Sequence, residues 1–491
     1  MCHPFLASSA LTEKVKDAEI THGRNALRAG DGAPNRFGYQ GDNVLLRRPW
    51  VILAVVLGLR MASAGAHAED LLEAYHQGLV ASPLITEARA ELRAARAGEP
   101  LARAALLPHV NAGASAGLNN ATISGGLFPT TSGPYHSNSY SVTLTQPLFD
   151  GAAFAALHAA DREVQGARAA LAYAKQSLAL RITQAYFAAL RATADVRVAR
   201  EEARLLTKVY RQAQTALKVG TGDLVSVDEA KARADAARAQ VVNALNAAQI
   251  ARRALARLTQ APIGILSDVR SLSPRGPIPD RAAPWIAMAL RNQPLLKEAK
   301  AQLRAAEDQV SVARRSGWPT ISLSGVAEHS LGTFFPGMQI NQAGASVNLM
   351  VPLYEGGQVD ASVQRAEAEA EARRAGLANL SQSIRLRTET AFLALEDSVG
   401  QLQAAAAARK SARVSLIATR RGYALGARSV LDLLTSATGA ARAGRDYYQA
   451  LYHQIVARAQ LKAAAGVLSG RDIAAINALL HAPEGRRALP H

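Results

Sequence analysis

Residues 423–432 have the sequence YALGARSVLD. Gly426 stands between two long alanine-rich stretches of helix-forming residues. Glycine is the residue that leaves a helix most easily through a left-handed conformation, and the aliphatic residues that follow begin another helix within a few positions. The stretch therefore predicts the tip of a helical hairpin, at which the chain reverses.

A weaker copy of this stretch, LKVGTGDLVS, occupies residues 217–226 in the other half of the chain. Gly220 and Gly426 are 206 residues apart. Alternating strand patterns and prolines repeat at similar separations: PLFDG at 147–151 returns as PLYEG at 352–356, and Pro83 and Pro108 return as Pro294 and Pro319. The chain is therefore expected to be a duplicated protein.

Long helices are expected on both sides of each tip, over residues 154–217, 227–258, 361–420 and 430–468. The first would be roughly 95 Å long at ~1.5 Å per residue, far beyond the usual globular helix. A seven-residue repeat along it keeps one seam against a neighbouring helix; its members are Leu157, Val164, Leu171 and Leu178.

Each half also carries two segments in which apolar residues alternate with small or polar ones, the pattern of a strand. They are 110–118 and 140–145, joined by an expected loop over 119–137, and 321–324 and 343–351. An apolar face opposite a polar one suits a membrane β-barrel with a wet lumen. Four strands cannot close a barrel and open edges are not tolerated in lipid, so several copies must share one, and a trimer would supply twelve strands.

Three aromatic residues are expected at the periplasmic membrane interface. Phe149 and Tyr354 are placed identically after each strand pair, and Trp318 precedes the third strand. The alternative is a soluble sheet with helical stalks, which leaves the helix length unexplained. The expected fold class is therefore mostly α with a small β part, built from duplicated long-helix hairpins and four strands per protomer.

The sequence also predicts the domain layout. Arg47-Arg48, the apolar run 50–59 and the ending Ala66-His67-Ala68 are typical of a signal peptide over 44–68, preceded by an upstream extension, 1–43. The first repeat is expected over 69–261, a proline-rich connector over 262–282, the second repeat over 283–468 and a C-terminal tail over 469–491. No cysteine follows the cleavage site, so no lipid anchor is expected there.

Composition excludes several functions. The net charge of +17 is spread along helices without a basic stripe or nucleic-acid motif, so no nucleic-acid partner is expected. The only cysteine is Cys2, which leaves no disulfide or cysteine-ligated metal site in the rest of the chain. No catalytic constellation is recognisable. We therefore expect no enzyme activity, cofactor or metal.

The ordered set of helix, strand pair, Pro-Leu-aromatic-acid-Gly motif, long helix, glycine tip and returning helix, present twice from about Glu69 to Leu468, resembles the TolC family of outer-membrane efflux and secretion ducts, in its non-lipidated branch. The resemblance implies a homotrimer embedded in outer-membrane lipid. A twelve-stranded barrel would cross that membrane, and helices would form a tunnel through the periplasm, closed at its inner end by the tips.

Within this resemblance, Tyr423 and Arg428 match the tyrosine and arginine that latch the mouth shut. An ungapped alignment puts Val225 and Ser226 where the partner threonine and aspartate stand. Ser226 makes a weaker hydrogen bond than a carboxylate. Two nearby carboxylates are alternative partners, Asp223 and Asp228. An ordinary solvated helix end would also account for Tyr423 and Arg428.

Asp432 matches the first of the family's two gate aspartates, and the second falls on Thr435. A trimer would then carry three carboxylates in place of six, which predicts a weaker cation preference and weaker divalent-cation block. A lone aspartate at this place is also the favourable charge for a helix N-terminus, and both roles can hold together.

The resemblance further implies that a periplasmic adaptor docks on the tips, at residues 219–221 and 425–427: Val219, Gly220, Thr221, Leu425, Gly426 and Ala427. Chain reversal alone would also explain the two glycines. The implied partner beyond the adaptor is an inner-membrane ABC or proton-driven transporter, which would decide whether drugs, metals or polypeptides are exported. The alternative function from another class is a periplasmic helical scaffold or adhesion protein, which needs no closed barrel.

Overall fold

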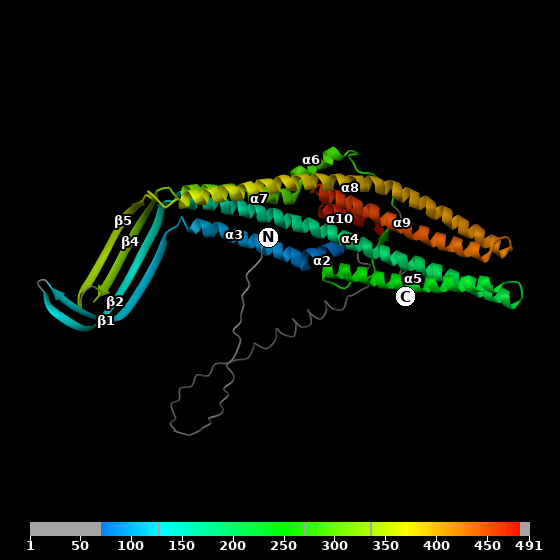
Figure 1. Ribbon diagram of the computed structural model, residues 1–491, viewed down its shortest axis with the longest axis horizontal. Coiled ribbons are helices and arrows are strands. Elements are labelled where there is room, and N and C mark those ends of the chain that lie inside the picture. Colours follow the sequence, from blue (N-terminus) through cyan, green and yellow to red (C-terminus); the bar gives the residue numbers. More distant parts are fainter. Residues whose placement is uncertain (1–69, 126–127, 270–271, 334–335, 482–491) are drawn as a thin grey trace, which may run out of the picture. The chain divides into compact units, whose positions relative to one another are not determined.

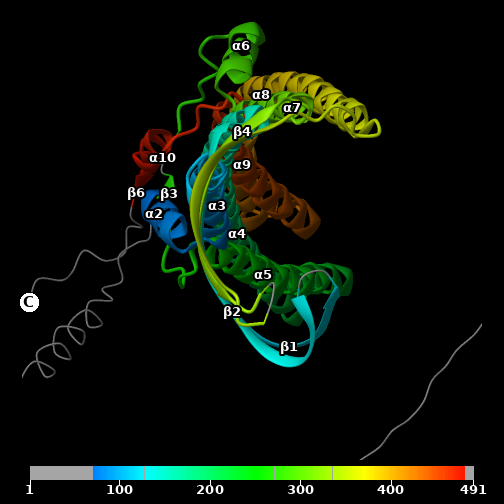
Figure 2. The ribbon, with the colours of Figure 1, turned by 90° about the vertical axis from the view of Figure 1, so that its left-hand side faces the viewer.

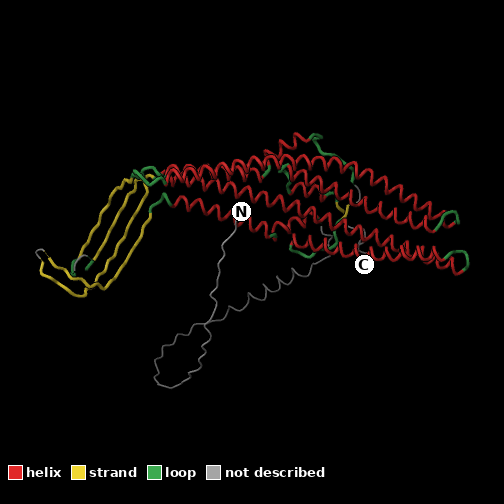
Figure 3. Tube along the Cα trace, viewed as in Figure 1, coloured by secondary structure: helices red, strands yellow, loops and turns green. Residues whose placement is uncertain are grey.

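The computed structural model describes residues 70–125, 128–269, 272–333 and 336–481. They belong to one compact unit that begins at Ala66. The expected extension 1–43 and signal peptide 44–68 lie outside the described residues, as do the last ten residues of the chain. The described part consists of long helices with a small sheet (Figure 3), which confirms the predicted class of mostly α with a small β part.

Each half of the chain opens with an 11-residue helix and then a 22-residue helix: α2 (Leu71–Ala81) and α3 (Pro83–Ala104), then α6 (Ala282–Asn292) and α7 (Pro294–Arg315). Pro83 and Pro294 stand in the first turn of α3 and α7, where a missing N–H breaks no helical hydrogen bond. The helices α2 and α3 are therefore separated just before Pro83, whereas Pro100 lies inside α3.

The main sheet has four antiparallel strands in the order β1-β2-β4-β5: β1 (His109–Gly125), β2 (Phe128–Phe149), β4 (Thr320–Leu331) and β5 (Gln339–Met350). β1 and β5 are its two edges. The sheet is curved (Figure 2). Strands from the two halves meet where β2 pairs with β4, so the duplication builds one sheet rather than two.

The register separates an apolar face from a polar one. One row across all four strands contains only small or apolar residues: Ala112, Val142, Ala327 and Ala343. The adjacent row, on the other face, is small or polar: Gly113, Ser141, Glu328 and Gln342. The sequence expectation of one apolar and one mostly polar face is confirmed.

The prediction of a loop over 119–137 was wrong, because most of these residues belong to β1 and β2. Serine, asparagine and threonine side chains join the two strands there by hydrogen bonds from Asn119 Nδ2 to Ser137 Oγ, at 2.8 Å, and from Thr122 Oγ1 to Ser132 Oγ, at 3.2 Å. These polar cross-strand pairs stabilise an extended hairpin in residues that sequence patterns assign to turns. The first hairpin is consequently longer than the second.

Two helical hairpins continue from the sheet: α4 (Gly151–Lys218) with α5 (Leu224–Thr259), and α8 (Gln358–Ala424) with α9 (Val430–Ala464). With 68 residues, α4 is about 100 Å long at ~1.5 Å per residue. Within this unit the sheet joins one end of α4 and α8, and both tips lie at the other (Figure 1). No helix in the described ranges combines the length and apolar character that crossing a membrane requires.

The largest apolar cluster lies midway along the helices, where α2, α4 and α9 meet, and contains Tyr186, Phe187 and Tyr452. The chain beyond α9 returns to this region as α10 (Gly470–Asn477), which packs on α2. A two-stranded sheet of β3 (Asp268–Val269) and β6 (Leu480–His481) joins the proline-rich connector to the C-terminal segment. The described residues that follow position 468 are therefore packed against the first repeat.

Candidate functional site: the two hairpin tips

The two tips have closely matching backbone hydrogen bonds at positions 206 residues apart, and the first tip has one more, from the Gly222 N–H to the Ala216 carbonyl at 3.1 Å. Gly220 and Gly426 both have φ of +75°, the left-handed conformation that glycine adopts without strain. The residue after each glycine donates its N–H to the last turn of the helix before it, Thr221 to the Ala216 carbonyl at 2.9 Å and Ala427 to the Gly422 carbonyl at 2.8 Å. Both predicted reversals are therefore present, with the same geometry.

The helix that leaves each tip is capped by one aspartate and one hydroxyl residue, in exchanged places. At the first tip the Asp223 carboxylate accepts the Ser226 N–H at 2.7 Å and the Ser226 hydroxyl at 2.7 Å. At the second tip the Ser429 hydroxyl accepts the Asp432 N–H at 3.1 Å, and the Asp432 carboxylate accepts the Ser429 N–H at 3.1 Å. Each tip therefore presents an exposed capping carboxylate, Asp223 or Asp432, at the start of its returning helix.

These hydrogen bonds stabilise the charged carboxylates. The backbone and hydroxyl of Ser226 lower the pKa of Asp223, and those of Ser429, followed by the charge of Arg428, lower the pKa of Asp432. Thr435, the other residue predicted at the gate, is exposed one turn beyond Asp432 on α9. The structure therefore brings both predicted gate residues to the exposed start of α9.

The predicted latch residues are distributed over both tips. Tyr423 is partly buried against the apolar cluster beneath the tips, and Arg428 is exposed close to Asp432. Val225 is exposed, and the Ser226 hydroxyl is bonded to Asp223 within its own tip. In the described part of one protomer, no hydrogen bond joins Ser226 to Tyr423 or Arg428. Any latch between the tips is therefore not formed by these pairs within one chain.

The residues predicted to dock an adaptor are all exposed at the two tips. Leu425 has 84% of its surface exposed and Val219 has 67%, and each directly precedes its positive-φ glycine. An aliphatic side chain held this far into solvent at the same place on both tips gives each tip a small apolar projection.

The predicted interface aromatics lie where the sheet meets the helices. Phe149 is the last residue of β2, Trp318 precedes β4, and Tyr354 lies between β5 and α8. All three are exposed, and the Arg315 guanidinium lies over the Trp318 ring, 5.3 Å from its centroid. All three therefore lie near the junction of the sheet and the long helices, and their place at a membrane interface stays a prediction.

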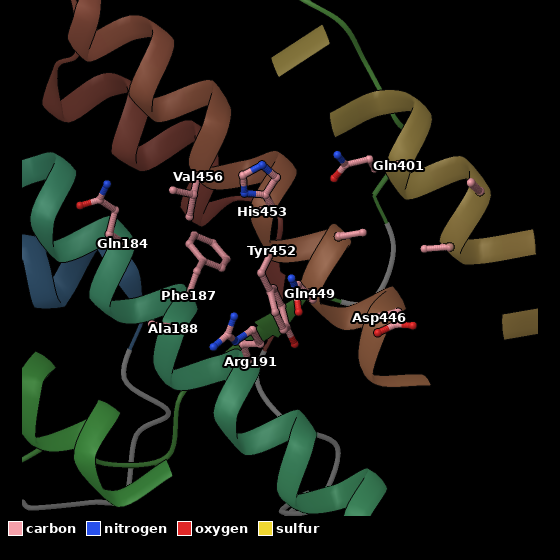
Figure 4. A pocket seen from close by; sticks show the side chains of 13 residues that line it. Gln184, Phe187, Ala188, Arg191, Gln401, Asp446, Gln449, Tyr452, His453 and Val456 are labelled. Carbon is pink, nitrogen blue, oxygen red and sulfur yellow. The ribbon is translucent and has the colours of Figure 1, made fainter. Parts of the chain in front are cut away.

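Sequence reasoning missed a polar region midway along the helices. A cavity of about 650 Å³ lies between α4, α8 and α9, and Figure 4 shows its lining, with Phe187 and Arg191 on α4 and Tyr452 and His453 on α9. The Tyr452 hydroxyl donates to Asp268 Oδ1 at 2.7 Å, and burial followed by the Asp268 charge raises the pKa of Tyr452. No sequence motif marks this region, because its residues come from distant segments.

Arg445 on α9 pairs with Glu202 on α4, and its charge also acts on Asp195 of the same helix. Arg445 Nη1 lies 3.0 Å from Glu202 Oε2, and the Glu202 side chain is only 9% exposed. Burial raises the pKa of Asp195, which the charges of Arg191 and Arg445 partly oppose. Asp195 and Glu202 are seven residues apart and so lie on one side of the helix, the one signal that the sequence offers. Among the described residues, no group of three or more histidine, cysteine or acidic side chains is placed to hold a metal ion.

A curved sheet with open edges, continued by paired helices of this length and ending in two matched tips, defines a subunit of an outer-membrane channel. Residues 74–260 and 285–467 match the family described as "Outer membrane efflux protein", and the chain belongs to that family. It is an exit duct of the outer membrane that extends into the periplasm.

Full-length relatives agree with this assignment. The chain is 27% identical over 436 residues to Outer membrane protein TolC of Vibrio cholerae, covering 87% of this chain and 97% of the relative. It is 28% identical over 436 residues to Alkaline protease secretion protein AprF of Pseudomonas aeruginosa, covering 86% and 89%. The fold matches that of the CmeC outer membrane channel of Campylobacter jejuni with a TM-score of 0.72, at 16% identity, over 84% and 90% of the chains. These names describe channel and secretion proteins, not enzymes.

Proposed function

We propose that three copies of this chain assemble into one duct, with a twelve-stranded barrel in outer-membrane lipid and a helical tunnel in the periplasm. The single observation that carries the proposal is the four-stranded curved sheet whose edge strands, β1 and β5, have no partner within the described protomer. Open strand edges leave backbone groups unpaired, which lipid does not tolerate. Pairing β1 of one copy with β5 of the next removes every edge.

The helices support the same assembly. In the half of the helical region that ends at the tips, the packing order is α5, α4, α9 and α8, so α5 and α8 form the two sides of the protomer there. Aliphatic residues are exposed on both: Val242, Leu245 and Ile250 on α5, and Leu386, Leu393 and Val414 on α8. An apolar surface on each side is what adjacent copies would bury against one another.

We propose the same domain layout as the sequence predicts, with the two repeats at 69–261 and 283–468, their connector at 262–282 and the C-terminal segment at 469–491.

The proposal is tested by purifying the full chain from outer membranes in detergent. We expect trimers that dissociate only on heating, and ion conduction when the protein is added to planar lipid bilayers. A water-soluble monomer without channel activity would contradict the proposal. That result would favour the helical scaffold or adhesion function, which needs no closed barrel.

At the periplasmic mouth we propose a gate in which Asp432 and Thr435 line the constriction, and Tyr423 and Arg428 hold it shut across protomers with Ser226 and Val225. Asp432→Asn should reduce cation preference and divalent-cation block, because one carboxylate per protomer is removed from a narrow pore. Single-channel recordings of the assembled trimer measure both quantities. Unchanged selectivity and block would remove Asp432 from the constriction.

Acidification gives the same prediction a second readout. Hydrogen bonds from Ser429 lower the pKa of Asp432, so the carboxylate stays charged to a lower pH than an ordinary aspartate. Ser429→Ala raises that pKa, and cation preference should therefore disappear at a higher pH as the solution is acidified. The control is Asp432→Asn, in which the Ser429→Ala change should leave the pH profile unmoved.

We propose that a periplasmic adaptor docks on the apolar projections at the tips, formed by Val219, Gly220 and Thr221, and by Leu425, Gly426 and Ala427. Thr221→Trp or Ala427→Trp should abolish export while trimers and channel activity remain, because a bulky side chain blocks the docked partner without reaching the helical core. Ala427→Ser is the matched control and should export normally. Normal export by both tryptophan variants would exclude docking at these positions.

We propose that an inner-membrane ABC or proton-driven transporter, joined through that adaptor, selects the cargo. Polypeptide export is supported by relatives named for the secretion of alkaline protease and of proteases. Small-molecule efflux is supported by the description of the family. Export assays with each class of pump, in cells that have this duct as their only one, distinguish a dedicated duct from one that serves several pumps.

A further inference from the structure

Gly422, in the last turn of α8, lies very close to Arg428, which follows the second tip. A Cβ atom built on Gly422 would lie 2.8 Å from Cγ of Arg428 and 3.5 Å from its Cβ. Carbon atoms in favourable contact are about 3.5–4.0 Å apart. Cγ is near the root of the arginine side chain, so it moves away only if Arg428 changes its first side-chain torsion or the tip backbone shifts.

The first tip makes the same approach with the residue types exchanged. The equivalents of Gly422 and Arg428, 206 residues earlier, are Ala216 and Gly222. A Cβ built on Gly222 would lie 3.0 Å from Cβ of Ala216 and also 3.0 Å from the backbone nitrogen of Leu217, so at the first tip the glycine faces the helix backbone as well as a side chain. Each tip therefore has one glycine at this contact, but the second tip has moved the glycine to the helix and placed a long cationic side chain opposite it.

The backbone does not explain why position 422 is glycine. Gly422 is not among the described residues with positive φ, and its carbonyl accepts the Ala427 N–H as the Ala216 carbonyl accepts the Thr221 N–H. Alanine is a better helix former than glycine, and Ala216 occupies the matching place without difficulty. The remaining reason for glycine at 422 is the space taken by the Arg428 side chain.

We propose that Gly422 is a positioning residue of the gate, whose missing side chain lets Arg428 lie across the end of α8 in the orientation that closes the mouth. The inference rests on the proposed role of Arg428 in the latch. The proposal adds a requirement to the latch: position 422 on α8 must carry no side chain. Arg428 is four residues before Asp432, and its charge contributes to the lowered pKa of that proposed constriction residue.

The test is a double-variant cycle on full-length trimers in planar bilayers, with closed-state conductance as the readout. Arg428→Gly should raise this conductance, and Gly422→Ala should raise it by roughly the same factor although the arginine is still present. The double variant Gly422→Ala with Arg428→Gly recreates the Ala216–Gly222 pair of the first tip. It should conduct like Arg428→Gly alone, because two changes that act through one side chain do not add.

Gly400→Ala is the matched control, since Gly400 lies on α8 with no atom within 4 Å of a built Cβ; it should remain closed. If Gly422→Ala does not form trimers but the double variant does, relief of the contact is demonstrated directly. If Arg428→Gly does not change the closed-state conductance, the proposed latch is overturned and this inference with it. If Arg428→Gly raises that conductance but Gly422→Ala does not, only the positioning role is overturned. The same holds if the two effects multiply in the double variant.

Discussion

Val142→Arg is expected to abolish outer-membrane trimers. Val142 lies near the middle of the paired strands, in the row that contains Ala112, Ala327 and Ala343, and it is exposed in the protomer. In the closed barrel this face meets lipid hydrocarbon. An arginine on the lipid-facing side near the bilayer midplane costs about 2–4 kcal/mol, and a trimer carries it three times.

The neighbouring residue provides the control, because adjacent strand residues face opposite sides. Ser141→Arg places the same charge in the polar row, opposite Glu328 in the β2–β4 register. Heat-stable trimers should persist in Ser141→Arg, with altered conductance, and should be absent in Val142→Arg. Gel mobility of unheated outer-membrane samples measures the first result and bilayer recording the second. If Val142→Arg assembles normally and Ser141→Arg does not, the two faces of the sheet have been assigned the wrong way round.

The long helices and the tips could be predicted from the sequence because their signals are local. Helix formers continue for more than sixty residues in α4 and α8 and stop at Gly220 and Gly426. The chain reversal at both tips could therefore be predicted from the sequence. The outer part of the first hairpin was not, since serine, threonine and asparagine there form cross-strand hydrogen bonds instead of turns. Serine, threonine and asparagine occur in both turns and strands, and here the hydrogen-bond partners on the opposite strand decide for the strand.

The site shows the same division. Asp432 and Arg428 were predicted by their match to a tip pattern, but the same alignment treated Ser226 as a weakened copy of an aspartate. The structure shows that Asp223 and Ser226 are the exchanged form of Ser429 and Asp432, with the carboxylate three residues earlier. An alignment compares one position at a time, whereas a capping interaction is satisfied by a pair. For that reason the alignment alone gives Asp223 only as an alternative partner.

The contacts that hold the two halves together join residues far apart in the sequence, so no local pattern reveals them. Arg445→Ala tests one such contact. Arg445 comes from the second repeat and Glu202 from the first, 243 residues earlier. Removing the arginine leaves Glu202, 9% exposed, without its cation, and leaves Asp195 with only Arg191 to oppose its burial. Breaking a fully buried pair costs roughly 3–5 kcal/mol. Because the Arg445 side chain is 29% exposed, we expect about 2 kcal/mol per protomer.

The pH dependence separates this electrostatic loss from lost packing. Burial already raises the pKa of Asp195, and removal of Arg445 raises it further. A carboxyl group whose pKa is higher in the folded state than in the unfolded state binds protons more tightly when folded, so stability rises as the pH falls through that value. The loss of stability caused by Arg445→Ala, relative to the unaltered protein, should therefore become smaller as the pH is lowered. Trimer dissociation temperatures at neutral and mildly acidic pH measure it, with exposed Arg442→Ala on the same helix as the control. A deficit that is equal at both pH values would mean that Arg445 contributes through the packing of its aliphatic stem rather than its charge.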